Sequence, residues 1–234
     1  MTERIPLVLV PGLLCDAALW AHQARHLGDI ADISVAETTQ DETMADMARR
    51  VLERAPSSFA LAGLSMGGYV SLEIMRQAPE RVRRLALLDT AAIADDADKR
   101  AQRQDLIALA ETGKFKGVTP RLLPLLVHPE RLEDPELTEA VMAMAGRVGK
   151  AAFLKQQRAI LGRIDSRPGL GAIDVPTLIV CGRQDALTPV ARHEEMASAI
   201  PGARLCIIED CGHLLTMERP EAATALLRDW LLRK

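Results

Sequence analysis

A serine flanked by glycines stands in the motif Gly63-Leu64-Ser65-Met66-Gly67. The apolar run from Phe59 to Ala62 precedes the motif, and the helix-like stretch from Tyr69 to Met75 follows it. A strand that turns sharply into a helix strains the backbone at the serine, lifts the hydroxyl above the sheet and leaves little space beside it except for glycine. The start of the helix also favours negative charge that develops there. The motif therefore predicts a nucleophile at Ser65, with an ordinary surface turn as the alternative.

A serine hydroxyl is a weak nucleophile until a base takes its proton, so a histidine must lie within hydrogen-bond reach. His213 follows the apolar run from Arg204 to Ile208, and Gly212 before it allows a tight approach. We therefore expect His213 to be the base. The remaining histidines are expected to be solvated rather than catalytic: His22, His26, His128 and His193.

The base needs a carboxylate that fixes its tautomer and stabilises its charged form. Asp185, after the apolar run from Val175 to Cys181, gives the chain order Ser, Asp, His that is typical of this motif. Three alternatives stay open. Asp89, which also follows an apolar run, could reach the same histidine. Asp210 is close to His213 in sequence, which disfavours contact with its ring, and Asp185 could instead cap a helix.

Attack on a carbonyl also needs backbone N–H groups that hold the oxyanion. Met66 supplies one by its position after the serine. The turn Gly12-Leu13-Leu14 supplies the other, with Leu13 as the predicted donor and Leu14 as the alternative. The side chains of Leu13, Leu14 and Met66 would then line the pocket. Cys15 lies beside this turn, and as a nucleophile it would need its own histidine and helix start. We therefore place it with Leu14 among the substrate-binding residues.

These residues follow short apolar runs, as expected of strands buried on both faces of a parallel sheet. The predicted strands cover 5–10, 30–36, 59–62, 82–88, 175–181 and 204–208. The predicted helices cover 43–55, the stretch from the serine motif to Pro79, a helix to Ala199 capped by Thr188 with Pro189 in its first position, and 220–232. The fold class is α/β, with a six-stranded, mostly parallel sheet and helices on both faces. Sites in such sheets lie at the carboxyl ends of the strands.

The alternation of strand and helix stops between residues 95 and 171. Candidate helices there cover 96–112, 118–127, 135–146 and 150–163, with a break at Gly149. A block of helices between two strands of one sheet is most simply an insertion. We predict a core formed by 1–94 and 172–234 and a helical cap formed by 95–171.

The composition of the 234-residue chain excludes several classes of function. A net charge of −3 gives no basic field for nucleic acid. No apolar run approaches the length of a membrane span or a signal-peptide core, which predicts a cytoplasmic protein. The cysteines at 15, 181, 206 and 211 show no CxxC spacing, so no metal site is predicted, and reduced thiols fit that compartment. We expect a monomer or small homo-oligomer with neither nucleic-acid nor membrane partners.

Four stretches resemble the α/β-hydrolase superfamily, and the resemblance covers essentially the whole chain. They are VPGLLCDAALW at 10–20, GLSMGG at 63–68, GRQDALTP at 182–189 and GH at 212–213. The resemblance implies Ser65 as nucleophile, Asp185 as acid, His213 as base, and the amides of Leu13 and Met66 as the oxyanion hole.

The chain departs from the superfamily pattern in two respects. The usual His-Gly after the first strand is Pro11-Gly12 here, so the role of that histidine in other members does not carry over. The chain also begins where the third strand of the superfamily usually lies, which implies a reduced sheet.

We expect a serine hydrolase that cleaves carboxylic esters of small or medium-chain substrates through an acyl-enzyme, without cofactor or metal. A serine nucleophile disfavours the dehalogenase and epoxide-hydrolase chemistry that uses an aspartate. A thioesterase, a lactonase and a carbon–carbon hydrolase or lyase are alternatives on the same residues, and a ligand-binding protein with residual hydrolysis is another. A carbon–carbon hydrolase would favour a cation near the pocket, for which the candidates are Arg121, Arg147, Lys155 and Arg158.

Overall fold

The computed structural model describes residues 4–233. Within that range six strands form one sheet in the order β2-β1-β3-β4-β5-β6, and every neighbouring pair is parallel. The strands are β1 (Ile5–Val10), β2 (Ala31–Val35), β3 (Phe59–Leu64), β4 (Val82–Leu88), β5 (Thr177–Gly182) and β6 (Arg204–Ile208). The predicted six-stranded α/β sheet is confirmed, and all of its strand pairs are parallel.

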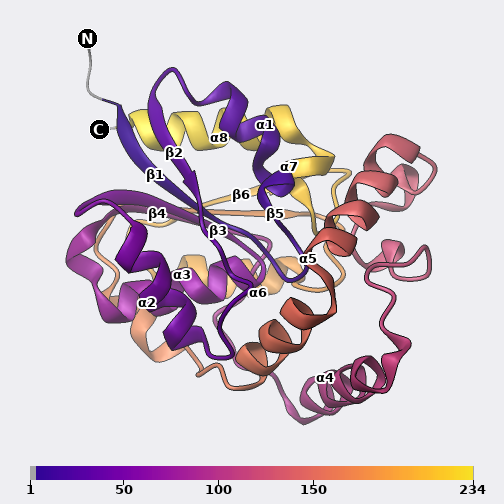
Figure 1. Ribbon diagram of the computed structural model, residues 1–234. Helices are drawn as coiled ribbons and strands as arrows, with labels where there is room; N and C mark the ends of the chain where they lie inside the picture. Colours follow the sequence, from indigo (N-terminus) through magenta and orange to yellow (C-terminus); the bar gives the residue numbers. More distant parts are fainter. Residues whose placement is uncertain (1–3, 234) are drawn as a thin grey trace.

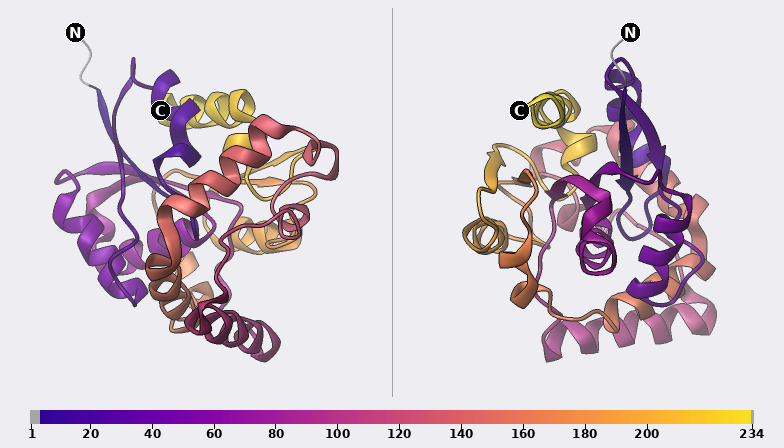
Figure 2. Two further views of the ribbon diagram at one scale, coloured as in Figure 1. Left: turned by 45° about the vertical axis from the view of Figure 1, so that its right-hand side comes forward. Right: turned by 90° about the vertical axis from the view of Figure 1, so that its left-hand side faces the viewer.

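Side chains along each strand point alternately to the two faces of the sheet. Leu7 and Leu9 of β1 pack in the apolar layer under α1, α7 and α8, whereas Val8 and Val10 pack in the layer under α2, α3 and α6. These helices are α1 (Ala21–His26), α2 (Met44–Arg54), α3 (Met66–Gln77), α6 (Val190–Ala199), α7 (Leu215–Glu218) and α8 (Pro220–Leu232). Figures 1 and 2 show the two helical layers on opposite sides of the sheet.

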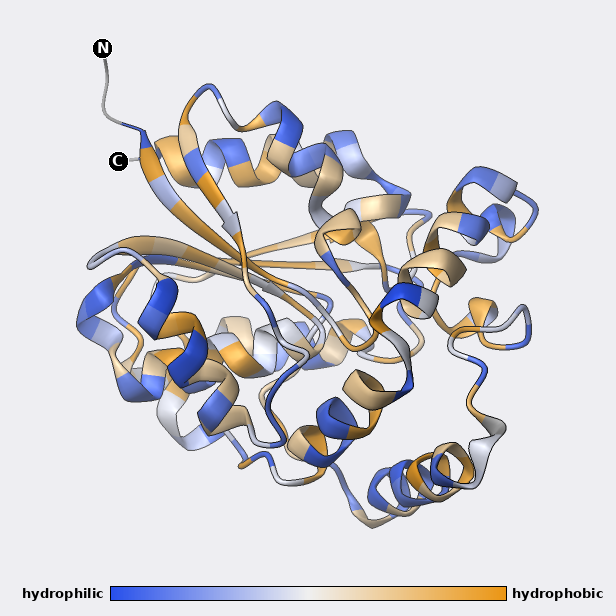
Figure 3. Cartoon of the chain, in the orientation of Figure 1, coloured by the Kyte–Doolittle hydropathy of each residue, from blue (hydrophilic) through white to orange (hydrophobic). Residues whose placement is uncertain are grey.

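Position in the sheet decides how apolar a strand must be. All six residues of the inner strand β3 are buried, whereas every residue of the edge strand β6 is only partly buried. Each fully buried leucine or phenylalanine contributes roughly 1.5–3 kcal/mol relative to an exposed one. Figure 3 shows the result as an apolar sheet between helices that are apolar on one side.

The inserted segment, residues 95–171, lies between β4 and β5. Its main elements are α4 (Ala97–Leu109) and α5 (Pro135–Leu161), with shorter turns at Ala110–Lys114, Leu123–Leu125, Pro129–Arg131 and Arg167–Ala172, and the structure shows no strand in it. α5 bends at Gly149, where φ is 76° and ψ is 177°, as the predicted break requires. None of the helices within residues 4–233 has the length and apolar character needed to pass through a bilayer.

Two local predictions are wrong. The stretch predicted as a helix over 118–127 holds only the short 3₁₀ turn at Leu123–Leu125. Pro120 and Pro124 lack the N–H groups that a continuous helix needs. Thr188 does not cap α6 either. Pro189 is the N-cap, with an extended ψ of 156°, and the Thr188 hydroxyl donates to Asp185 instead.

We predict that Gly67→Ala destabilises the protein. A Cβ on Gly67 would lie 2.0 Å from the Val10 carbonyl oxygen, so β1 or α3 must move, at a cost of roughly 1–3 kcal/mol or more. Gly146→Ala, in an open part of α5, is the matched control and should raise stability by up to about 1 kcal/mol. Urea unfolding of both variants measures the difference, and equal stabilities would contradict the packing described here.

Candidate active site

Ser65 lies at the tip of the turn between β3 and α3. Its φ of 56° and ψ of −118° form a strained conformation that residues with a side chain rarely adopt. Two hydrogen bonds hold the strained peptide: the Ser65 N–H donates to the Leu88 carbonyl at 3.0 Å, and the Thr90 hydroxyl donates to the Ser65 carbonyl at 2.8 Å. A Cβ on Gly63 would lie 2.2 Å from the Gly67 carbonyl oxygen, so both flanking glycines are needed for close packing.

His213 lies in the loop after β6, with its ring directed toward Ser65. Its Nε2 is 2.9 Å from Ser65 Oγ, and the residue is only 2% exposed. The His213 N–H donates to the carbonyl of Leu126, in the inserted segment, at 3.0 Å. The carboxylate of Glu218 accepts the N–H of Leu214 at 3.2 Å. The loop is therefore fixed from two sides, which restricts the position of the imidazole.

Asp185, in the loop after β5, contacts the other side of the imidazole. Its Oδ2 accepts from His213 Nδ1 at 2.8 Å and from the Thr188 hydroxyl at 2.5 Å, and its Oδ1 accepts the N–H groups of Leu187 and Thr188. Burial alone would raise the pKa of Asp185, but the charge of His213 and these hydrogen bonds outweigh it and lower that pKa. With Nδ1 donating to Asp185, Nε2 is left to accept from Ser65. Asp210, a rival for this place, has a 64% exposed side chain.

Asp89, the other rival, lies at the end of β4 and is fully buried. Its carboxylate accepts the N–H of Gly182 at 2.9 Å and the N–H of Leu215 at 3.1 Å. It therefore joins the loop that carries Asp185 to the loop that carries His213. Burial raises the pKa of Asp89 well above its usual value, and the nearby negative charge of Asp185 is the second cause of this shift.

The turn after β1 places the predicted oxyanion donor, Leu13, and its alternative, Leu14, differently. The Cys15 N–H closes the turn onto the Gly12 carbonyl at 3.2 Å. The Leu14 N–H donates to the side-chain oxygen of Gln156 at 3.0 Å, so the alternative donor is already bound. Within residues 4–233 the Leu13 N–H donates to no partner. Leu14 has a φ of 59°, a left-handed conformation that costs a leucine roughly 1–2 kcal/mol.

The same turn lies directly against the serine. A Cβ on Gly12 would be 3.3 Å from Ser65 Cβ, so glycine is needed here for close approach. Met66 is the first residue of α3, where an N–H has no acceptor within the helix, and its side chain is buried in the core. Cys15 Sγ donates to the Leu13 carbonyl at 3.4 Å, and burial raises the pKa of that thiol to about 12.

The expectation that the other histidines are solvated is wrong for two of them. His193 in α6 is fully buried, and its Nε2 accepts the N–H of Thr90 at 2.9 Å. Burial lowers the pKa of His193 to about 4, so the neutral ring serves as a hydrogen-bond acceptor. His128 is 8% exposed, and its Nδ1 accepts the N–H of Glu130. Both rings satisfy backbone amides, which explains their burial.

Apolar side chains of the inserted segment form one cluster with the turn after β1. Its members are Leu14, Ala110, Ala145 and Phe153, with Leu13, Phe115, Val118, Val148 and Leu154 partly buried around them. The rings of Phe115 and Phe153 lie 5.0 Å apart between centroids. The side chains of Leu13 and Leu14 thus belong to an apolar cluster beside the free Leu13 amide.

Several residues that organise the site were missed by sequence reasoning. Thr188 stands three positions after Asp185, a spacing at which its hydroxyl and N–H can both reach the carboxylate. Such a local pattern could have been noticed. Gln156 and Glu218 give no such signal, because Gln156 contacts a residue 142 positions away and Glu218 accepts an N–H 90 positions away.

The chain is similar to known proteins over nearly its whole length. A family model described as the alpha/beta hydrolase fold matches residues 5–220. A pimeloyl-[acyl-carrier protein] methyl ester esterase of Neisseria meningitidis serogroup C is 27% identical over 218 residues, which cover 92% of this chain and 84% of that protein.

Solved structures are similar as well. A thermophilic esterase from Thermogutta terrifontis has a TM-score of 0.87 and 29% identity, covering 97% of this chain and 89% of the other. The enol-lactonase from Burkholderia xenovorans LB400 has a TM-score of 0.88 and 24% identity, and the match covers 98% of this chain and 92% of the other. This match shows similarity of fold.

We predict that the effect of Asp89→Asn on stability depends on pH. Because folding raises the pKa of Asp89, its contribution is full below the ordinary pKa of about 3.9 and is lost as pH rises through the folded-state pKa. The stability difference between wild type and Asp89→Asn should therefore be largest near pH 4 and shrink toward pH 8.

Asp185→Asn is the control of opposite sign. Folding lowers the pKa of the Asp185 carboxyl in the wild type. Its contribution to stability is therefore present above about pH 4 and declines only as pH falls further. Urea unfolding at a series of pH values measures both variants. A difference for Asp89→Asn that stays constant or grows with pH would show that its pKa is not raised.

Proposed function

The chain belongs to the alpha/beta hydrolase fold family, and we propose that it is a carboxylic-ester hydrolase that forms an acyl-enzyme on Ser65. The observation that carries the proposal is the pair of hydrogen bonds from Asp185 through His213 to Ser65, at 2.8 and 2.9 Å. Similarity to proteins named as esterases supports an ester as the bond that is cleaved.

In the proposed first step, Ser65 Oγ attacks the carbonyl carbon of the ester while His213 Nε2 takes the hydroxyl proton. Asp185 stabilises the resulting imidazolium. The negative charge that forms on the carbonyl oxygen is held by the amides of Leu13 and Met66, and each such donor lowers the barrier by roughly 3 kcal/mol in comparable sites. His213 then gives its proton to the departing alcohol oxygen as the C–O bond breaks.

In the second step, water attacks the acyl-enzyme and gives a proton to His213 Nε2. Collapse of the tetrahedral intermediate breaks the bond to Ser65 Oγ, which recovers the proton from His213. The acid product leaves, and the enzyme returns to its first state. His213 Nε2 accepts and donates the proton in both steps.

We propose that the substrate is a small-molecule ester with a short or medium acyl chain. The support is the apolar cluster beside the Leu13 amide, which brings aliphatic side chains and Phe153 to the side of the site where the ester carbonyl would bind. Apart from Phe115 and Phe153, the members of this cluster are aliphatic.

Thioesters and lactones could use the same residues, and no contact favours them over esters. The carbon–carbon alternative would need a free cation to hold a substrate carboxylate. Three of the candidates are engaged elsewhere: Arg147 pairs with Asp16 at 2.7 Å, Lys155 donates to the Gln40 carbonyl, and Arg158 pairs with two carboxylates. Arg121 is exposed. These contacts disfavour the carbon–carbon alternative.

We expect p-nitrophenyl esters of short and medium acyl chains to be hydrolysed faster than long-chain esters, matched thioesters or matched lactones. The physical reason is the apolar cluster beside the Leu13 amide, which suits an acyl chain of limited length. Initial rates across the series give kcat/KM for each substrate. If only thioesters or only lactones turn over well, the ester assignment is wrong.

We expect Ser65→Ala and His213→Ala each to reduce kcat by roughly 10⁴ or more, and Asp185→Asn to reduce it by less. The first two changes remove a group that forms or transfers a bond, whereas the third weakens orientation of the imidazole. Asp89→Asn is the comparison variant, because Asp89 bonds backbone amides only. An inactive Asp89→Asn beside an unimpaired Asp185→Asn would reassign the acid.

A further inference from the structure

The turn after β1 has a backbone conformation that its own sequence does not favour. The bond from the Cys15 N–H to the Gly12 carbonyl defines a four-residue turn whose third residue, Leu14, has a φ of 59°. Leu13 is not among the residues with positive φ, so the turn is of type II, which normally requires glycine at the third position. Leucine there means that a contact from outside the turn maintains the conformation.

That contact is Gln156, from α5 of the inserted segment. Its side-chain oxygen accepts the Leu14 N–H at 3.0 Å, and Gln156 is fully buried. At the other end of the same peptide, the Leu13 carbonyl accepts from Cys15 Sγ. In a type I turn this peptide would be rotated by roughly half a turn, and the Leu14 N–H would point away from Gln156. The hydrogen bond to Gln156 therefore selects type II.

The other end of the Gln156 amide is held as firmly. Its Nε2 donates to the Thr38 carbonyl, in the loop after β2, at 3.1 Å. These two bonds fix the orientation of the amide. If it were reversed, its NH₂ group would face the Leu14 N–H and its oxygen would face the Thr38 carbonyl. Gln156 thus bridges the loops after β1 and β2.

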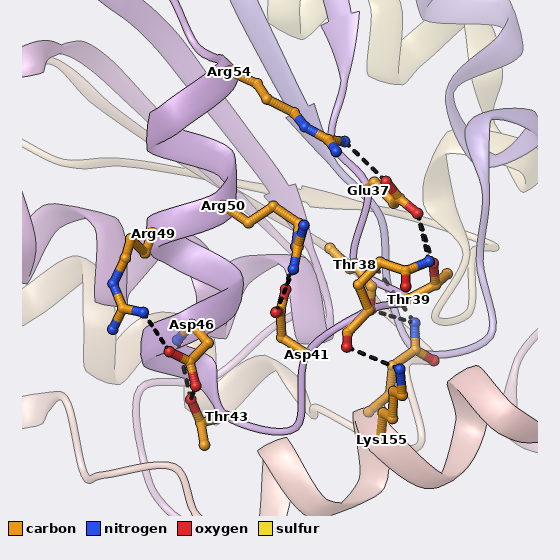
Figure 4. A network of polar contacts seen from close by, with 12 residues as sticks. Glu37, Thr38, Thr39, Asp41, Thr43, Asp46, Arg49, Arg50, Arg54 and Lys155 are labelled. Atoms are coloured by element: carbon orange, nitrogen blue, oxygen red, sulfur yellow. Dashed lines mark hydrogen bonds and ion pairs between the residues drawn. The ribbon is translucent and has the colours of Figure 1, made fainter.

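The loop that carries Thr38 is anchored to the core. Arg54 of α2 pairs with Glu37 at 2.8 Å, and Arg50 of α2 pairs with Asp41 at 2.6 Å. Figure 4 shows both ion pairs on either side of Thr38, with Lys155 of α5 beside the same loop. The bridge therefore joins the turn to a fixed support.

Resting on the proposed function, we propose that Gln156 is a positioning residue for the oxyanion hole. The Leu13 amide is the neighbour of the peptide that Gln156 holds, and the turn lies against Ser65, with a Gly12 Cβ placed 3.3 Å from Ser65 Cβ. Without the bond to Gln156, the strain at Leu14 is relieved by movement of the turn against Ser65, which displaces the Leu13 amide from the place where it would meet the developing oxyanion. A small displacement of an oxyanion donor lowers kcat strongly.

The test compares Gln156→Leu with Gln157→Leu on a p-nitrophenyl ester. Gln157 is the matched control: it is also a buried amide of α5, but its oxygen accepts from Arg103 and does not contact the turn. We expect Gln156→Leu to lower kcat by roughly 10- to 100-fold with KM changed less than about threefold, because the Leu13 N–H is displaced from the oxyanion. Gln157→Leu should keep kcat within about threefold.

A second substitution separates positioning from a general loss of structure. Leu14→Gly accepts positive φ without strain, so adding Gln156→Leu to Leu14→Gly should lower kcat much less than Gln156→Leu lowers it in wild type; Leu14→Gly alone is the reference, because it also removes a side chain from the apolar cluster. If Gln156→Leu does not fold, Gln156→Asn takes its place, because a side chain shorter by one carbon cannot span both Leu14 and Thr38. The inference would be overturned by an unchanged kcat in the folded Gln156 variant, or by a Gln156 substitution that lowers kcat as much in Leu14→Gly as it does in wild type.

The wild type separates this inference from the proposed function. If wild-type protein neither hydrolyses the ester nor reacts with a fluorophosphonate at Ser65, the proposed function fails. If wild type does both and the Gln156 variant matches it in kcat, only the positioning role fails.

Discussion

Two hydrogen bonds hold the imidazole of His213 between Asp185 and Ser65, and neither bond is local in sequence. They depend on the order of the parallel strands, because β3, β4, β5 and β6 are neighbours and all end at the same edge of the sheet. The buried carboxyl of Asp89, at the end of β4, connects the loops on either side of it. The geometry of the site is thus a consequence of the sheet order.

Backbone strain is concentrated at that same edge. In the described chain, the residues other than glycine with positive φ are Leu14, Ser65, Asp89 and Asp210, and each follows the end of a strand. Strain of this kind costs roughly 1–3 kcal/mol per residue and persists only where the surroundings impose it. At Leu14 the surroundings are the hydrogen bond that its N–H donates to Gln156; at Ser65 they are the bond donated to the Leu88 carbonyl and the bond accepted from the Thr90 hydroxyl. The apolar layers on both faces offset the cost.

The inserted segment contributes to the site through backbone and amide groups as well as through apolar side chains. The Leu126 carbonyl accepts the N–H of His213, Gln156 holds the turn after β1, and Arg147 pairs with Asp16 just beyond that turn. These contacts reach the loop after β1, which carries the proposed oxyanion donor Leu13, and the loop after β6, which carries the proposed base His213.

The sequence alone determined the sheet and its strands and marked Ser65, Asp185 and His213 as candidates, because apolar runs and the glycine motif report local constraints. It did not determine which acid faces His213, which amide of the turn is free, or why His193 and His128 are buried. Those outcomes depend on contacts between residues far apart in the chain, such as Gln156 with Leu14 and Asp89 with Leu215. Only the tertiary structure decides them, because a hydrogen bond between distant segments leaves no periodic or local pattern in the sequence.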